Sequence, residues 1–198
     1  MIRMNGRRIR QWTAVALGTI LISLLGATEA SAAYVSGTNY FGARWQSPTV
    51  CVENRTSGLR DPVHSAVWDW SVHTDVIAHH GLGTGSCNAF AQHIYVVQGN
   101  YGKTGWVGKV EYSLRWGQTE NGNSTWLFNT GVVIRLNTYY KNTWGGWDHI
   151  ATHELGHALG LGHSNWTCDS VMTQKSGCPW LQLTTSNDRN WINAIYAQ

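Results

Sequence analysis

The 198-residue sequence predicts an α+β domain, and three observations lead to this class. Apolar residues recur with helical spacing in three stretches, at about 62–75, 148–159 and 188–196. Alternating or β-branched runs, which are typical of strands, occur at 49–52, 92–98, 106–116 and 131–136. The second helical stretch also carries residues 153–163, His-Glu-Leu-Gly-His-Ala-Leu-Gly-Leu-Gly-His, and we expect the rest of the domain to be organised around them.

The boundaries of these elements follow from local signals. Asp61-Pro62 predicts the start of the first helix, with Asp61 as its N-cap, because proline suits the first helical turn. The pair His79-His80, next to Gly81, predicts a loop. Apolar residues at Val107, Val110, Tyr112 and Leu114 predict a strand over 106–116, whereas the β-branched run 131–136 predicts a buried one.

The first 32 residues predict a secretory signal peptide, which takes no part in the fold. Four arginines precede an apolar run at 13–25, and Ala30-Ser31-Ala32 is a small-residue cleavage site. The apolar run is too short to span a bilayer comfortably, so an uncleaved membrane anchor is the weaker alternative. We therefore expect residues 33–198 to form one secreted, extracellular domain with no membrane attachment after cleavage.

The charge of the chain resides in the signal segment. The whole sequence has 14 Lys+Arg and 11 Asp+Glu, of which four basic residues and Glu29 precede residue 33. The remaining 10 basic and 10 acidic residues cancel, which removes the support for nucleic-acid binding. The exported part is long enough for one domain with a real core, and we expect a monomer.

All four cysteines lie after the signal segment. An even number in an exported chain predicts two disulfides, for which three pairings are open. We favour Cys51–Cys87 and Cys168–Cys178, because each of these bridges closes a local loop. A zinc site built from cysteines is the alternative, but the sequence has no Cys-x-x-Cys spacing.

The histidines of residues 153–163 have the spacing of metal ligands. His153 and His157 lie four residues apart, so a helix places them one turn apart on nearly the same face. Gly160 can take a left-handed conformation that ends the helix and brings His163 back as a third ligand. Three neutral imidazoles leave zinc one open position for water, which is the pattern of catalytic sites. Glu154 lies beside this face and can act as a general base.

These residues resemble the metzincin clan of zinc peptidases, whose signature is His-Glu-x-x-His-x-x-Gly-x-x-His followed by a methionine. Ser164, directly after the third histidine, is similar to the matrixin branch of that clan. The resemblance implies a twisted, mixed five-stranded sheet with about three helices, in which 106–116 is the edge strand beside the cleft. It also implies a secreted zinc endopeptidase acting on extracellular proteins or peptides.

Two further residues enter through this resemblance. Met172 is similar to the Met-turn that lies beneath the metzincin zinc, although a core gap-filler is the alternative. Asp188 matches the matrixin aspartate that supports the Met-turn, and its alternative is an exposed acid at a helix start. Thr173 departs from the family, which often has tyrosine or proline after the methionine. The sequence contains no propeptide between signal and domain, so we expect a form that needs none.

The resemblance leaves other features open. His73-Thr74-Asp75 contains ligand-type residues, but it ends a helix, so we assign no second, structural zinc to it. A calcium ion stays open, and no residue can be assigned to it. The rival function is a secreted, non-catalytic module, stabilised by zinc, that binds a peptide or glycan. Glu154 discriminates between the two, because a binding module needs no base at that position.

Overall fold

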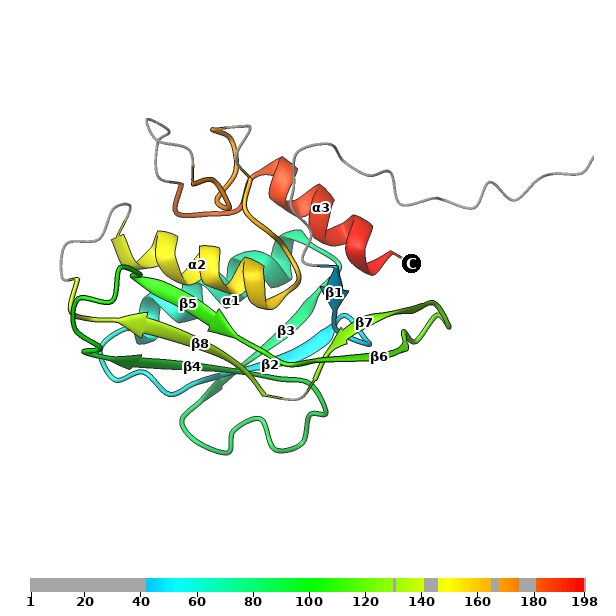
Figure 1. Ribbon diagram of the computed structural model, residues 1–198, viewed down its shortest axis with the longest axis horizontal. Helices are drawn as coiled ribbons and strands as arrows, with labels where there is room; N and C mark the ends of the chain where they lie inside the picture. The colour runs from blue at the N-terminus through cyan, green and yellow to red at the C-terminus, as the bar shows by residue number, and fades with distance from the viewer. Residues whose placement is uncertain (1–41, 130, 141–145, 165–167, 175–180, 198) are drawn as a thin grey trace, which may run out of the picture. The chain divides into compact units, whose positions relative to one another are not determined.

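The computed structural model describes residues 42–129, 131–140, 146–164, 168–174 and 181–197 (Figure 1). These residues belong to one compact unit, Ala32–Gln198. The predicted signal segment lies outside the described residues, so its cleavage and the domain boundary at residue 33 stay predictions. Among the described helices, none is both long enough and apolar enough to cross a membrane.

The centre of the domain is a mixed sheet of five strands in the order β3-β2-β4-β8-β5. Neighbouring strands are parallel from β3 to β8, whereas β5 runs antiparallel to β8 at the edge of the sheet. The predicted α+β class with a mixed five-stranded sheet is therefore confirmed. The bounds of these strands are β2 (Thr49–Asn54), β3 (Ile77–Leu82), β4 (His93–Gly99), β5 (Gly108–Glu111) and β8 (Val132–Asn137).

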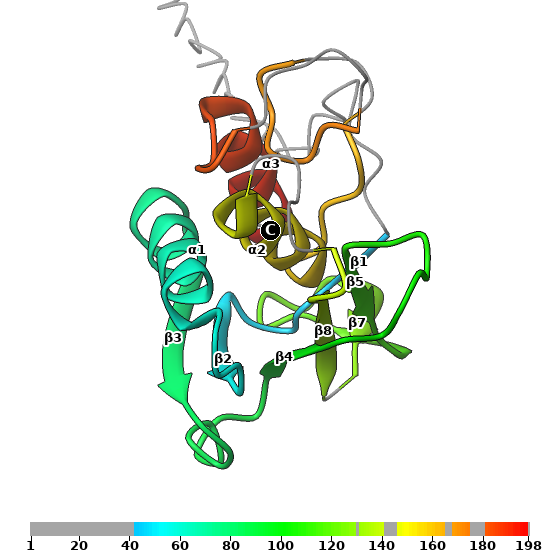
Figure 2. The ribbon, with the colours of Figure 1, turned by 90° about the vertical axis from the view of Figure 1, so that its left-hand side faces the viewer.

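Three helices accompany the sheet in the described residues, as predicted: α1 (Arg60–His73), α2 (Gly146–Ala158) and α3 (Ser186–Tyr196). Helices α1 and α2 pack against each other on one face of the sheet (Figure 2). Val96 and Ile134, on neighbouring strands, meet Val63 of α1 and Leu155 of α2 in the hydrophobic core. Burial of such side chains stabilises the fold by about 1.5–3 kcal/mol each, which fixes α2 against the sheet.

The start of α1 differs from the prediction. The N-cap residue is Leu59, which makes no side-chain capping hydrogen bond, and Asp61 lies inside the first turn. The expectation that Asp61 is the N-cap is therefore wrong. The physical reason is that several N–H groups in the first turn of a helix have no partner within the helix. A proline can therefore stand at more than one position of that turn, and it does not identify the N-cap residue. Asp61 still stabilises this helix end through the helix dipole.

The predicted strand 106–116 is divided between two sheets. The chain forms β5, leaves the strand at residues 112–113 and continues as β6 (Leu114–Gln118). Strand β6 pairs antiparallel with β7 (Ser124–Phe128), which in turn pairs with β1 (Ala43–Arg44) in a three-stranded sheet. The alternation of apolar residues continues across residues 112–113, and alternation alone does not say with which partner a strand pairs.

The expectation of a loop at His79-His80 is also wrong, because both residues lie in β3. Strand β3 is at the edge of the sheet and only half buried, so polar side chains can point away from the core. His80 contacts Asn54 on the neighbouring strand, with 3.3 Å between Nε2 and Nδ2. The position at the edge therefore allows a histidine pair in a strand where a central position would not.

The first predicted disulfide is confirmed. Cys51 on β2 and Cys87 in the loop after β3 are bonded, with their Cα atoms 5.6 Å apart. The bridge ties this loop to a central strand. The second predicted pair, Cys168–Cys178, includes Cys178, which lies outside the described residues, and this bridge stays a prediction.

Candidate metal centre

Helix α2 and the turn after it bring three histidines together. His153 and His157 lie on α2, which ends at Ala158. Gly160 follows with φ 111°, a conformation that favours glycine, and the N–H of Leu161 donates to the carbonyl of Gly156 at 3.0 Å. This turn reverses the chain so that His163 faces the two helical histidines.

The Nε2 atoms of these histidines converge on one point. His157 Nε2 lies 3.0 Å from His153 Nε2 and 2.9 Å from His163 Nε2. Among the described residues, they form the one group of at least three His, Cys, Asp or Glu side chains close enough to hold a metal ion. His73 and Asp75, the rejected second-zinc residues, are not part of such a group.

Hydrogen bonds on the outer side of two rings fix which nitrogen faces the centre. His153 Nδ1 donates to the carbonyl of Val171 at 2.8 Å, and His157 Nδ1 donates to the carbonyl of Leu161 at 2.7 Å. A neutral ring that carries its proton on Nδ1 has a lone pair on Nε2. Both rings therefore present an unprotonated Nε2 to the centre, as metal ligands do.

Burial keeps these imidazoles neutral. The exposed fractions of His153 and His157 are 7% and 5%. Loss of hydration lowers the pKa of His157 to about 4 and holds the pKa of His153 well below its ordinary value. Burial also lowers the pKa of His163. Three neutral nitrogen donors suit zinc, so the residues present fit the metal that the spacing predicts.

Glu154 lies between α2 and the edge strand β5. Its exposed fraction is 6%, and burial raises the pKa of its carboxyl to about 8. A Cβ atom on Gly108, the first residue of β5, would lie 2.5 Å from Glu154 Oε1. The backbone of β5 therefore lies directly against this carboxylate, with no side chain between them.

The segment around Met172 packs against α2. Met172 is fully buried, and its carbonyl accepts a hydrogen bond from the N–H of Ser164 at 2.8 Å, next to His163. A Cβ on Gly156 would lie 2.5 Å from Met172 Sδ and 3.0 Å from Trp70. The methionine thus packs against the helical turn that separates His153 from His157.

Asp188 connects this segment to α3. Its carboxylate is fully buried and accepts hydrogen bonds from the Ser170 hydroxyl at 2.5 Å and the Val171 N–H at 2.9 Å. It also accepts from the N–H of Thr185, which closes the capping box of α3. An exposed helix acid, the alternative in the sequence, is therefore excluded. Since Val171 holds His153, one chain of contacts runs from α3 to the histidine cluster.

Three residues that contact the site were not predicted from the sequence. His149 is 1% exposed, its Nδ1 donates to the carbonyl of Leu181 at 2.5 Å, and its ring lies 5.7 Å from that of His153. Its place four residues before His153 was the available signal. Gly108 and Gly156 were missed because the contacts that require glycine come from distant parts of the chain.

Comparison with known proteins gives one match. The family model described as Metallo-peptidase family M12 matches residues 82–198, which is more than half of the chain and includes the whole histidine cluster. A search of curated proteins finds no match. The three helices and the mixed five-stranded sheet are consistent with a metzincin-type peptidase domain.

Proposed function

The chain belongs to metallopeptidase family M12, and on this premise we propose that it is a secreted, zinc-dependent endopeptidase with Glu154 as the general base. The observation that carries the proposal is the convergence of three Nε2 atoms beside a buried carboxylate. A metal centre of this kind needs neutral nitrogen donors, and the burial of His153 and His157 supplies them.

His153, His157 and His163 would hold one zinc ion. When bound, zinc supplies a Lewis acid that polarises a peptide carbonyl and lowers the pKa of a water ligand to about 7. Glu154 takes a proton from the attacking water and then delivers it to the leaving amine. Burial raises the pKa of Glu154, and a metal ion held by the three histidines would oppose this rise by favouring the ionised carboxylate.

The substrate lies along β5 in this proposal. Strand β5 is last in the order of its sheet, so one of its edges is open to an added strand in the described structure. An extended polypeptide can pair its backbone with this edge, as peptides do in β-strand addition. Gly108 would then place the scissile bond next to Glu154, because its Cα lies against that carboxylate.

The non-catalytic binding module is the second candidate. Its support is the number of tryptophans, 12 in the whole sequence, several of which are exposed. A binding module does not need a buried carboxylate next to its metal ligands, since an uncompensated buried acid destabilises a fold. Membership of a metallopeptidase family also favours the enzyme.

We propose further that the chain is matrixin-like within its clan. Ser164 after His163, and the contacts of Asp188 with Ser170 and Val171, support this placement. Thr173 departs from the matrixin pattern, and the family match is to M12. A phylogenetic tree that includes both branches tests the placement, and grouping with M12 sequences alone would reject it.

Secretion and processing form a separate part of the proposal. We expect an extracellular, monomeric chain that starts at Ala33 and is active without removal of a propeptide. N-terminal sequencing of the active protein from culture medium tests this. An active form that starts well inside the domain, or one found only inside the cell, would contradict it.

The test of the catalytic proposal is Glu154→Gln. Glutamine keeps the shape of the side chain but cannot accept a proton, so we expect kcat/KM on a peptide to fall at least about 100-fold. Zinc content, measured by elemental analysis, should stay near one per chain, because Glu154 is not a ligand. The matched control is Asp148→Asn, an acid in the first turn of the same helix, which should leave activity unchanged. Hydrolysis by Glu154→Gln within a few-fold of wild type would remove Glu154 from the mechanism.

A further inference from the structure

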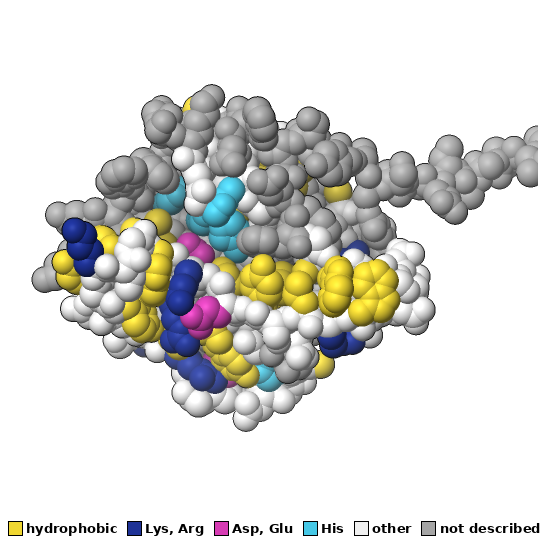
Figure 3. Space-filling view, in the orientation of Figure 1, with side chains coloured by type: hydrophobic (Ala, Val, Ile, Leu, Met, Phe, Trp, Pro, Cys, Tyr) yellow, Lys and Arg dark blue, Asp and Glu magenta, His cyan; other side chains and the backbone are white. Residues whose placement is uncertain are grey.

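The hairpin β6–β7, together with Tyr112 just before it, carries apolar side chains on the surface of the domain. Trp116 is 61% exposed and Trp126 48%, while Leu114 and Tyr112 are each 39% exposed. We call these four residues the aromatic row. Figure 3 shows hydrophobic side chains in a row beneath the histidines, over the position of β6 and β7 in Figure 1. Exposed apolar surface of this kind often marks a binding site.

The row is held in a defined arrangement. Trp116 and Trp126 are direct cross-strand partners, and their rings meet edge to face with centroids 5.5 Å apart. Phe128 on the same hairpin is buried, and it packs against both Tyr112 and the core residue Trp45, at 5.3 Å in each case. The exposed rings are thus part of an ordered structure that is anchored in the core, which favours a recognition surface.

The row continues the strand that lies beside Glu154. Strands β5 and β6 follow each other in the chain, and each is the edge strand of its own sheet. Gly108 at the start of β5 touches Glu154, and Trp116 lies eight residues further along. At about 3.3 Å per residue, the row begins roughly 13 Å from Gly108 and ends within about 26 Å of it.

We propose that the aromatic row binds an apolar segment of an extended polypeptide substrate, beyond the residues that pair with β5. This proposal rests on the peptidase function proposed above. It assigns a substrate class, namely unfolded or extended protein segments that carry aliphatic or aromatic residues several positions from the scissile bond. The row adds binding energy at a distance from the reacting atoms, so it acts on substrate affinity.

The geometry favours a polypeptide over a glycan. Sugar rings stack on broad, flat aromatic faces, but the two tryptophan rings stand at 81° to each other and form no flat platform. They form instead a ridged apolar surface that suits side chains projecting from an extended chain. Arg115 lies between Leu114 and Trp116 but points to the other face, where it donates to Gln46.

The test compares short and long substrates. The short substrate is a six-residue peptide, chosen by library profiling, that reaches only about 10 Å on either side of the scissile bond. The long substrates add eight residues at one end or the other, either alternating Leu-Ser and Phe-Ser or entirely Gly-Ser. We expect the apolar extension at one of the two ends to lower KM about 10-fold relative to Gly-Ser, with kcat unchanged.

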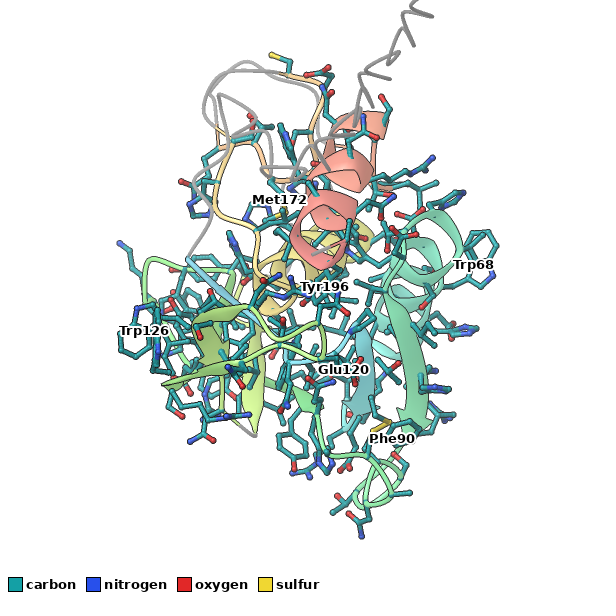
Figure 4. All side chains as sticks on the ribbon, turned by 90° about the vertical axis from the view of Figure 1, so that its right-hand side faces the viewer. Trp68, Phe90, Glu120, Trp126, Met172 and Tyr196 are labelled. Carbon is teal, nitrogen blue, oxygen red and sulfur yellow. A yellow bond between two sulfur atoms is a disulfide. The ribbon has the colours of Figure 1, made fainter. Side chains whose placement is uncertain are left out.

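The variant is Trp116→Thr/Trp126→Thr, in which threonine keeps a strand-forming residue at both positions. It should lose the gain from the apolar extension and cleave the short peptide as well as wild type. The matched control is Trp68→Ala, because Trp68 is 54% exposed on α1 and lies on the other side of the domain from Trp126 (Figure 4). This control should keep the full gain.

A second readout does not depend on hydrolysis. Calorimetry with Glu154→Gln should show about 10-fold tighter binding of the apolar long peptide than of the Gly-Ser peptide, and the two threonine substitutions should abolish the difference. Equal affinities would overturn the proposal, as would a gain that survives the substitutions. Binding of soluble oligosaccharides, or a dimer that the substitutions dissociate, with no peptide effect, would assign the row to another partner. Absence of hydrolysis by wild type would instead contradict the peptidase function. The calorimetric comparison would still test whether the aromatic row binds the apolar peptide.

Discussion

On one side of the three histidines, the segment around Met172 is fixed by side-chain hydrogen bonds to α3, whereas on the other side β5 presents only backbone to Glu154. Ser170 and Val171 both donate to the fully buried Asp188. Gly108, in contrast, has no side chain, and the residues of β5 are only half buried. We call the first region the floor and the second the rim.

The difference shows that the part of the site that positions the histidines is separate from the part that a substrate would approach. The floor carries the carbonyl of Val171 that orients His153, so any movement there reaches a proposed metal ligand directly. The rim touches only Glu154, the proposed base, and an ion pair of Glu111 with Arg135 joins β5 to the neighbouring strand β8 at the surface. Changes at the rim should therefore lower catalytic activity and leave metal binding unchanged, whereas changes at the floor should lower both.

The largest effect is expected from Gly108→Ala at the rim. The new Cβ would lie 2.5–2.7 Å from three atoms of Glu154, so either the strand or the carboxylate must move. Displacement of a catalytic group by about 1 Å costs roughly 100-fold in rate, and we expect a loss of this size in kcat/KM. Zinc content should stay at the wild-type value, which elemental analysis checks.

Lys109→Ala is the control for this substitution. Lys109 is the next residue on β5 and pairs with Glu111 at the surface, so its removal should change kcat/KM less than about 3-fold. If Gly108→Ala were as active as wild type, β5 would not lie against Glu154 in solution, or Glu154 would have no part in catalysis. Loss of zinc in Gly108→Ala would show that rim and floor are not separate.

The second effect is expected from Asp188→Asn at the floor. An amide cannot accept from both Ser170 and Val171 as the carboxylate does, so one buried donor loses its partner. We expect the free energy of unfolding to fall by about 2 kcal/mol, measured by urea denaturation, and zinc affinity to fall about 10-fold or more.

The matched control is Asp169→Asn, an exposed acid on the same turn that contacts Asn187. It should match wild type in both urea stability and zinc affinity. Unchanged zinc affinity in Asp188→Asn, together with lower stability, would limit the floor to a structural role and weaken the contrast with the rim.

The third effect is a pH dependence of the metal-free protein. Burial raises the pKa of Glu154 to about 8, whereas the unfolded chain releases this proton near pH 4.5. Between these values the folded state binds more protons, so its stability falls as pH rises. From pH 6.5 to pH 8 the loss from this group should be about 1.5 kcal/mol.

Glu154→Gln, stripped of metal with a chelator, should lack this component because glutamine does not titrate. Urea denaturation of both metal-free proteins at the two pH values gives the difference directly. Burial lowers the pKa values of His153, His157 and His163, and these histidines are present in both proteins, so their titration cancels in the comparison. Equal slopes in the two proteins would mean that Glu154 is hydrated in solution.

The sequence predicted the histidine cluster well because all three histidines lie on one helix and the turn that follows it. The spacing of four residues and the glycine at position 160 are local features, and helix geometry converts them into convergence. The division of 106–116 between two sheets was not predictable in this way. It depends on which distant strand each half pairs with, and β8 and β7 both follow later in the chain.

The glycine contacts show the same limit at the level of single residues. Gly108 and Gly156 look like ordinary sequence glycines, and only the folded chain reveals that Glu154 and Met172 fill the space where a side chain would be. The resemblance indicated Asp188 as a support, but not that one carboxylate would accept from Ser170 and Val171 together. Such contacts depend on how helices and strands pack against one another, and a sequence pattern gives no distances between residues of different elements.

The smallest expected effect is a coupling between Gly156 and Met172 in the floor. In Gly156→Ala the new Cβ would lie 2.5 Å from Met172 Sδ, and we expect overpacking to lower the free energy of unfolding by about 1–3 kcal/mol. Met172→Ala alone should also destabilise, because it leaves a cavity next to α2. In the double variant the methyl group added at position 156 occupies part of that cavity, so the combined loss should be smaller than the sum of the two single losses.

A coupling energy of about 1 kcal/mol, from urea denaturation of the four proteins, would fit the close approach of the two residues. Full relief is not expected, since the same methyl group would also lie 3.0 Å from Trp70, which Met172→Ala leaves in place. Strict additivity would show that α2 moves away from the floor in Gly156→Ala. The floor would then be as adaptable as the rim, and the contrast between the two sides of the histidines would fail.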